Sequence, residues 1–120
     1  MNRLLRSFGY AFQGIGFAFR TQANLRIHTV ISLAVVAAGL WLGLEPVEWA
    51  TLVVTMMVVV AAELMNTAVE AALDRVSTDH HPLAKAAKDA AAGAVLIGAI
   101  GAVIVGALIL GPHLLARLGG

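Results

Sequence analysis

The chain has 120 residues, of which 60% are hydrophobic and 12% are charged, about half the charged share of a soluble domain. This composition places it in the membrane class before any single residue is considered. The formal net charge of +1 gives no reason to expect a nucleic-acid partner. The absence of cysteine from the chain excludes disulfides, thiol catalysis and cysteine-ligated metals. The length suits a single domain over residues 1–120.

Residues 1–22 are predicted to form an amphipathic helix that lies on the membrane surface. Apolar side chains recur there at steps of three and four, as they do along one face of a helix: Leu5, Phe8, Phe12, Ile15 and Phe19. Polar side chains occupy a neighbouring stripe: Arg3, Arg6, Gln13 and Arg20. A signal peptide is the alternative. It is disfavoured because Gln13 and Arg20 interrupt the apolar region and no small-x-small cleavage site follows.

Three apolar runs predict three transmembrane helices, since about 20 residues are needed to cross a bilayer. The expected spans are residues 27–44, 49–73 and 86–112. A polar turn at 45–48 separates the first two spans, and the polar segment 74–89 separates the second from the third. The third span carries small residues four apart, which let helices approach closely in lipid: Ala94, Gly98, Ala102 and Gly106.

The basic residues predict the orientation in the membrane. Seven of the eight lysines and arginines precede the first span or lie between the second and third, and these two regions share one side. The positive-inside rule makes that side, with the N-terminus, cytoplasmic. Trp41 and Trp49 flank the turn on the opposite side, where interfacial indoles are typical.

Carboxylates within the second span are the first candidate site. Glu63, Asn66 and Glu70 stand at i, i+3 and i+7 and share one helix face, which Asp74 continues. Counted from Trp49, Glu63 lies about 21 Å along the helix, inside the apolar slab. An ionisable group there costs about 2.5 kcal/mol or more on insertion scales. Such a cost is tolerated when a cation, a proton or a reaction uses the carboxylates.

A second polar group lies where the third span begins. Lys85, Lys88 and Asp89 are at i, i+3 and i+4, so they share one face of the helix. The lysines would attract an anionic ligand such as a phosphate, and the carboxylates a divalent metal. His80 and His81 are expected to be solvated loop residues, because no HExxH or other histidine metal spacing is present.

From the residues alone, the site suits acid–base chemistry or cation binding beside a phosphate, and the reaction stays open. No Walker A or kinase catalytic-loop motif occurs. In one alternative, Glu63 and Glu70 are protonated or paired and only hold helices together, as in a non-catalytic scaffold. In another, they belong to a small proton- or cation-coupled transporter. The transporter is disfavoured because small multidrug transporters have more spans and because the other polar groups cluster near one interface.

The chain resembles the prokaryotic diacylglycerol kinase family over residues 62–97, which read AELMNTAVEAALDRVSTDHHPLAKAAKDAAAGAVLI. The matching pattern is E-x-x-N-[ST]-A-x-E-x-x-x-D, followed at a fixed distance by A-K-D. The N-terminal arrangement is also similar, through Arg3, Tyr10, Gly14 and the segment NLRIH at 24–28. The resemblance covers essentially the whole chain. The segment HPLAKAAKDAAAGAVL at 81–96 is more similar to the undecaprenol kinase branch than to the diacylglycerol-specific branch.

This resemblance implies a homotrimer of the bacterial inner membrane with its active site at the cytoplasmic interface. It implies transfer of the γ-phosphate of MgATP to the hydroxyl of a membrane lipid alcohol, with undecaprenol expected and diacylglycerol as the alternative. It implies that Glu63 is the catalytic base and Glu70 a Mg²⁺ ligand. Residues at the family's nucleotide-binding positions are Arg3, Tyr10, Asn66, Asp74, Lys88 and Asp89.

One position departs from the family pattern. Gln22 stands where the family normally has a glutamate that serves as a second metal ligand. An amide oxygen can still bind Mg²⁺, but it brings no negative charge. We therefore expect Gln22 to bind metal more weakly than a glutamate would, or the second ligand to come from elsewhere.

Overall fold

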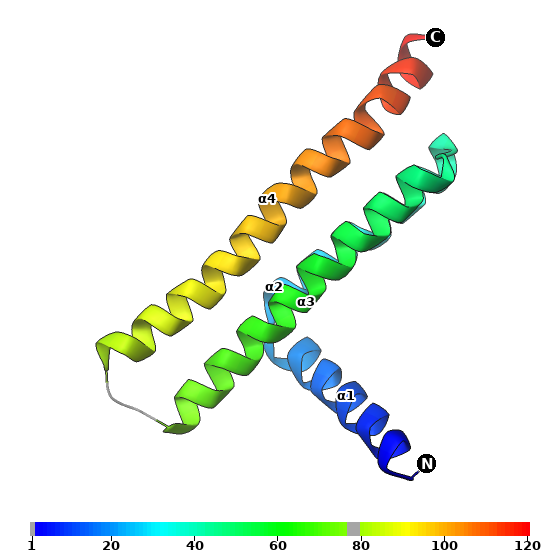
Figure 1. Ribbon diagram of the computed structural model, residues 1–120. Helices are drawn as coiled ribbons and strands as arrows, with labels where there is room; N and C mark the ends of the chain where they lie inside the picture. The colour runs from blue at the N-terminus through cyan, green and yellow to red at the C-terminus, as the bar shows by residue number, and fades with distance from the viewer. Residues whose placement is uncertain (1, 77–79) are drawn as a thin grey trace.

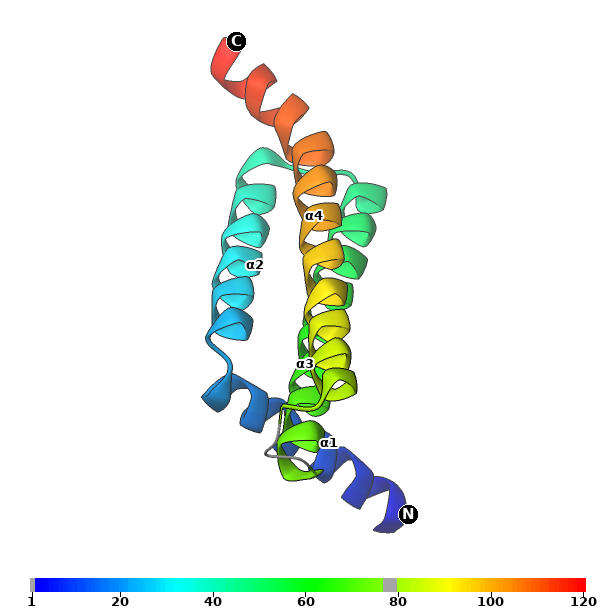
Figure 2. The same ribbon diagram turned by 90° about the vertical axis from the view of Figure 1, so that its left-hand side faces the viewer.

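The computed structural model describes residues 2–76 and 80–120, and the regular structure within these residues is entirely helical. Four helices follow in chain order: α1 (Asn2–Thr21), α2 (Ala23–Leu42), α3 (Pro46–Val76) and α4 (Pro82–Gly119). α2, α3 and α4 lie alongside one another, and α1 leaves this bundle at a steep angle (Figures 1 and 2). The α2–α3 turn and the C-terminus share one end of the bundle, while α1 and the start of α4 share the other. The predicted all-helical class is confirmed.

Three of the helices, α2, α3 and α4, are long and apolar enough to cross a membrane, as the sequence predicted. The 20 residues of α2 extend about 30 Å, the thickness of the hydrocarbon core of a bilayer. The 31 residues of α3 extend about 46 Å at the same rise per residue. α3 therefore continues past the start of α2, and this end of α3 packs beside α1 through Leu64, Thr67 and Ala71.

The turn between α2 and α3 is fixed by glycine and tryptophan. Gly43 adopts the left-handed conformation (φ 77°), and its N–H donates to the carbonyl of Gly39 at 2.9 Å. This is the usual helix stop, because glycine enters the left-handed region without steric cost. Gly39 is itself covered: a Cβ there would lie 2.7 Å from the Trp49 ring. Trp49 thus locks the first turn of α3 onto the end of α2.

α4 is longer than the sequence suggested. The expected span 86–112 lies within this helix, which begins at Pro82 and continues through Pro112 to Gly119. Two contacts hold this extension against its neighbours. The His113 Nε2 atom lies 3.0 Å from the Glu48 carboxylate, and the Arg117 guanidinium lies 4.5 Å from the centroid of the Trp41 ring. These contacts offset the helix hydrogen bond that proline cannot make.

Three small residues of α4 face the inside of the bundle. A Cβ on Gly98 would lie 3.7 Å from the Val59 side chain of α3, and Ala102 and Gly106 line a cavity between the helices. The small size of Gly98 therefore serves packing within one chain, whereas a Cβ on Gly106 would meet nothing within 4 Å and Ala94 is exposed. The large side chains of α4 are exposed instead, and none of its residues is buried.

Few of the described residues are buried, and the polar ones among them lie together on α3. The described residues with little exposure fall into an apolar group and a polar group: Ala18, Leu25, Leu52 and Val59, and then Glu63, Asn66 and Thr67. Large apolar side chains are exposed along α1, among them Leu5, Phe8 and Phe12. A lipid environment explains this exposure, but it does not explain a polar cluster in the most enclosed part of α3.

Arg26 ties α1 to α2. The chain turns at Gln22, which has extended backbone angles (φ −117°, ψ 107°). The Arg26 Nη1 atom donates to the carbonyls of Phe19 and Arg20, at 2.6 and 3.3 Å. These are among the last carbonyls of α1, which have no partner within the helix, and a cation also complements the negative end of the helix dipole. Arg26 therefore sets the direction in which α1 leaves the bundle.

Replacing Arg26 with Met should loosen α1, because two carbonyls lose a charged donor worth about 1 kcal/mol. Hydrogen exchange of the backbone amides in the last two turns of α1 should accelerate roughly five-fold, with little change in α3. Arg6→Met, on the exposed face of α1, is the matched control and should leave exchange unchanged. Equal exchange in the two variants would contradict the role given to Arg26.

Candidate active site

The site is built on the face of α3 that carries Glu63, Asn66 and Glu70. The Glu63 side chain is 1% exposed and the Asn66 residue 7%. Both carboxylate oxygens of Glu63, and the Oδ1 atom of Asn66, are buried without a hydrogen-bond partner among the described residues. An unsatisfied buried polar group costs about 1–3 kcal/mol, and more when charged. Three such acceptors on one helix face indicate a place prepared for a ligand or a reaction.

His28 is the ionisable side chain that α2 places against Glu63. Its Nε2 atom lies 3.3 Å from Glu63 Oε1, within ion-pair distance but not aligned as a hydrogen bond. The backbone at Glu63 is held separately, because the Thr67 hydroxyl donates to the Glu63 carbonyl at 2.8 Å. Neither residue had a role predicted from the sequence. A histidine at the start of an apolar span was the signal available, since such residues usually face a bundle interior.

Glu70 is held between two amides. Gln22 Nε2 donates to Glu70 Oε2 at 3.1 Å, and Asn66 Nδ2 donates to Glu70 Oε1 at 3.2 Å. The structure thus brings together three residues that the sequence analysis had selected, although Gln22 lies 48 residues from Glu70. A glutamate in place of Gln22 would put two carboxylates at this distance, an arrangement that needs a proton or cation between them. Because the Gln22 amide is a neutral donor, its contact with Glu70 needs neither a proton nor a cation.

The donors around Glu70 fit a magnesium ion. They are oxygens, namely the Glu70 carboxylate, the unpartnered Asn66 Oδ1 and, after rotation of its amide, the Gln22 Oε1. Mg²⁺ prefers oxygen ligands and commonly takes one or two carboxylates together with water and substrate phosphates. Within residues 2–76 and 80–120, no group of three His, Asp or Glu side chains is placed to hold a metal. The charge at this position therefore comes from Glu70.

A second polar group joins the end of α3 to the start of α4. Lys88 Nζ lies 2.6 Å from Asp74 Oδ1, and Lys85 Nζ lies 2.6 Å from Asp89 Oδ2. Next to them is a cavity of about 440 Å³, lined in part by Lys85, Lys88, Asp89 and His81. These ion pairs are substantially exposed, so they add little to stability. Lys88 can therefore exchange its carboxylate partner for a phosphate at small cost.

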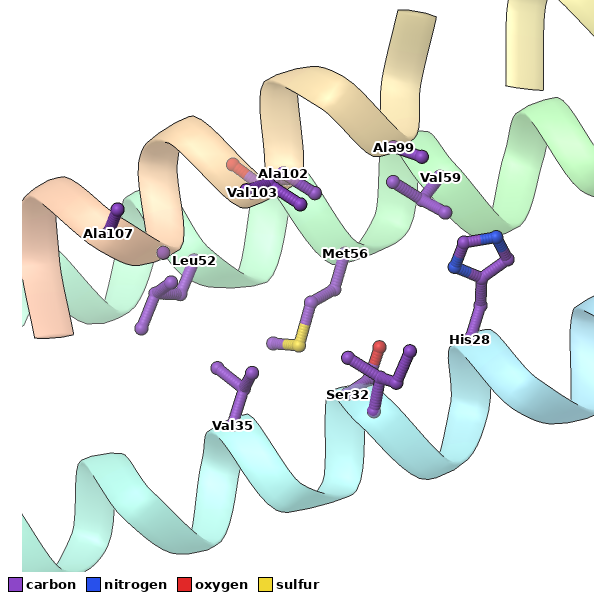
Figure 3. Close-up of a pocket in the computed structure, with 13 residues that line it drawn as sticks. His28, Ser32, Val35, Leu52, Met56, Val59, Ala99, Ala102, Val103 and Ala107 are labelled. Atoms are coloured by element: carbon purple, nitrogen blue, oxygen red, sulfur yellow. The ribbon is translucent and has the colours of Figure 1, made fainter. Parts of the chain in front are cut away.

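An apolar cavity of about 260 Å³ runs between α2, α3 and α4. Figure 3 shows His28 at one end of it, with aliphatic side chains from all three helices along the rest. The apolar residues that line the cavity and are labelled in Figure 3 include Val35, Leu52, Met56, Val59, Ala102 and Val103. Because His28 also contacts Glu63, the buried carboxylate lies next to the polar end of an otherwise apolar space.

The sequence matches the family model described as prokaryotic diacylglycerol kinase over residues 9–110. The chain belongs to the prokaryotic diacylglycerol kinase family. It is 51% identical over 116 residues to a diacylglycerol kinase of Synechocystis sp., covering 96% of this chain and 66% of that protein. It is 41% identical over 114 residues to the undecaprenol kinase of Bacillus subtilis, covering 95% and 93% of the two chains. A diacylglycerol kinase of Escherichia coli is 33% identical over 111 residues, covering 92% and 91%.

These relatives confirm the resemblance and place the chain among lipid kinases. The chain spans slightly less than two thirds of the length of the Synechocystis relative. The two alternative functions, a transporter and a non-catalytic scaffold, are not supported, because the relatives are named as kinases that act on lipids. The polar end of the bundle is thus the candidate active site of a prokaryotic diacylglycerol kinase family member.

Two nucleotide-binding residues implied by the family resemblance stand apart from the others. Arg3 and Tyr10 lie on exposed parts of α1, and Tyr10 is 66% exposed. In the part of the chain that the structure describes, neither side chain makes a hydrogen bond or ion pair. The N-terminal end of α1 points away from the start of α4 (Figure 1). Their contact with nucleotide therefore remains a prediction.

Replacing Gln22 with Glu should make the site dependent on a cation, because it sets a second carboxylate against Glu70. Without metal, the melting temperature in detergent should fall. Added Mg²⁺ should restore it, at a half-effective concentration about 10-fold lower than that seen for the unaltered chain. The control is Gln13→Glu on the exposed side of α1. A Mg²⁺ response identical in both variants would exclude Gln22 and Glu70 as the metal position.

Proposed function

We propose that this protein is an ATP-dependent kinase that phosphorylates undecaprenol in the membrane, with Glu63 as its general base. The observation that carries the proposal is the Glu63 carboxylate, buried and without a hydrogen-bond partner among the described residues, beside the polar end of an apolar cavity. A lipid alcohol likewise has one polar end, its hydroxyl group, and an apolar chain. The site therefore offers a base to the hydroxyl and an apolar surface to the chain.

The chemistry requires a base at this position. As the lipid hydroxyl attacks the γ-phosphorus of ATP, its proton passes to a Glu63 carboxylate oxygen. The new oxygen–phosphorus bond forms while the bond from the γ-phosphorus to the bridging oxygen of ADP breaks. Both Glu63 oxygens are free to accept the proton, because no described donor is aligned with them. Burial of the carboxylate also keeps water from competing as the phosphate acceptor.

The nucleotide is proposed to lie across the ends of α3 and α4. Lys88 would contact its phosphates, with Asp74, Asp89 and Asn66 around them, and α1 would contribute the residues predicted there. Glu70, with the amide oxygens of Asn66 and Gln22, would hold Mg²⁺, which neutralises charge on the phosphates. The cavity of about 440 Å³ beside Lys88 supports nucleotide binding at this end of the bundle.

Undecaprenol is the proposed acceptor because residues 81–96 read like the undecaprenol kinase branch. The relative from B. subtilis is named an undecaprenol kinase. Diacylglycerol is the second candidate, since the relatives from Synechocystis and E. coli carry that name. The apolar lining of the cavity suits either chain. The choice between the two alcohols is therefore a matter for direct measurement.

The proposed setting is a homotrimer in the bacterial inner membrane with the N-terminus and active site on the cytoplasmic side. The exposed apolar faces of α4 support burial against lipid or further copies of the chain. The excess of basic residues before α2 and between α3 and α4 supports the orientation.

Phosphate transfer from labelled ATP into extractable lipid tests the function, with undecaprenol and diacylglycerol offered separately in mixed micelles with Mg²⁺. Glu63→Gln should lower transfer by about 10²- to 10⁴-fold, the usual contribution of a general base, and should leave assembly intact. Glu45→Gln, at the opposite end of the bundle, is the matched control and should stay active. Full activity of Glu63→Gln would refute the assigned base, and the faster alcohol identifies the substrate.

Lys88→Met should raise the KM for ATP about 10-fold, because the phosphates lose a charge-assisted contact. The melting temperature should change little, since the pair with Asp74 is exposed. Arg75→Met removes an exposed cation from the end of α3 and serves as the comparison. An unchanged KM for ATP in Lys88→Met would place the nucleotide elsewhere.

A further inference from the structure

The Glu63 carboxylate needs a partner that the kinase reaction itself does not supply. A charged carboxylate in apolar surroundings is costly unless it is paired or hydrogen-bonded. Glu70, two helical turns further along α3, carries the same charge, and its own oxygens are already bound by the amides of Gln22 and Asn66. Among the described residues, the cationic or proton-donating side chain within 4 Å of the Glu63 oxygens is His28.

His28 lies on α2, whereas Glu63 lies on α3, and the histidine approaches one of the two carboxylate oxygens. Its Nε2 atom lies 3.3 Å from Oε1, and its side chain is 23% exposed where that of Glu63 is 1% exposed. The ring also closes one end of the apolar cavity, with Val59 and Ala99 nearby (Figure 3). The other residues along the cavity bring no titratable group from α2, α3 or α4. His28 is thus the titratable side chain that the cavity presents to a lipid hydroxyl, beside the hydroxyl groups of Ser32 and Thr55.

We propose that His28 is a positioning residue for Glu63, an inference that rests on the proposed kinase function. A small rotation of the ring from its present position would align Nε2–H with Glu63 Oε1, so that it donates there and fixes the rotation of the carboxyl group. Oε2, which has no partner among the described residues, is then left to accept the proton of the lipid hydroxyl. A glutamate has several rotatable bonds, and a base that is misplaced by about 1 Å can lose about 100-fold in rate. Because the donor comes from α2, the position of the base depends on the packing of α2 against α3.

This role predicts which kinetic constants change. The nucleotide-binding residues proposed on α3 and α4 form separate ion pairs and do not touch His28. Loss of His28 should therefore lower kcat and leave the KM for ATP near its original value. The KM for lipid should change less than kcat, since most of the cavity lining remains.

The test compares three variants with the unaltered protein in the mixed-micelle transfer assay. His28→Leu removes the donor while keeping an apolar side chain, and kcat should fall about 10- to 100-fold. His28→Gln restores an N–H donor and should recover most of that loss. Val30→Ala, on the same helix but exposed and outside the cavity lining, is the matched control and should stay within about two-fold of the original kcat.

Nitrogen-15 NMR of protein labelled in its imidazole rings gives a readout that does not require activity. The His28 resonances are identified by their loss in His28→Gln, and they should shift in Glu63→Gln but not in Glu45→Gln. An unshifted His28 signal in Glu63→Gln, or a His28→Leu variant as active as Val30→Ala, would overturn the positioning role alone. If the unaltered protein transfers phosphate to neither lipid, the proposed function fails, and the positioning role fails with it.

Discussion

Burial of a carboxylate inside an apolar helix is the constraint on which the rest of this structure depends. Glu63 lies in a part of α3 where an isolated charge is costly, and it is as enclosed as any side chain that the structure describes. His28 of α2 offsets this cost by lying against the carboxylate. The Thr67 hydroxyl donates to the backbone carbonyl of Glu63 itself. The packing of α2 on α3 is therefore more than the assembly of two apolar surfaces. It decides whether the carboxylate can exist at that depth.

The turn between α1 and α2 supplies a partner to the second carboxylate on this face of α3, Glu70. Arg26 binds the terminal carbonyls of α1, and this contact fixes the turn from which Gln22 reaches Glu70. The family resemblance led us to expect a glutamate at this position, and the amide of Gln22 changes what holds the site together. A pair of carboxylates is stable only around a cation or proton, whereas an amide and a carboxylate are stable by themselves. The contact between Gln22 and Glu70 can therefore form without a cation.

The two ends of the bundle serve different needs. One end gathers Glu63, Glu70 and the Asp74–Lys88 pair beside a polar cavity, and the apolar cavity extends from His28 along the helices. In the proposed reaction, a water-soluble nucleotide would approach from the side of Lys88 and a lipid alcohol from the apolar cavity. The opposite end is held by contacts that serve packing, namely Trp49 over Gly39 and the His113–Glu48 pair. This separation suits a reaction in which only one product leaves into water.

The sequence by itself determined the helices, their apolar character and the shared face of Glu63, Asn66 and Glu70. These properties follow from hydropathy and from the 3.6-residue period, which the backbone hydrogen bonds of a helix fix locally. The family pattern lies in the same stretch, so the class of reaction could also be read from it.

The tertiary structure decided the partners across helices. Gln22 with Glu70, His28 with Glu63 and Lys88 with Asp74 are joined by helix packing, which no spacing along the chain specifies. Packing also carried α4 beyond Pro112, because His113 and Arg117 found partners on other helices. The role of His28 was hidden for the same reason. A histidine at the start of an apolar span has no defined chemistry until a neighbouring helix places a carboxylate beside it.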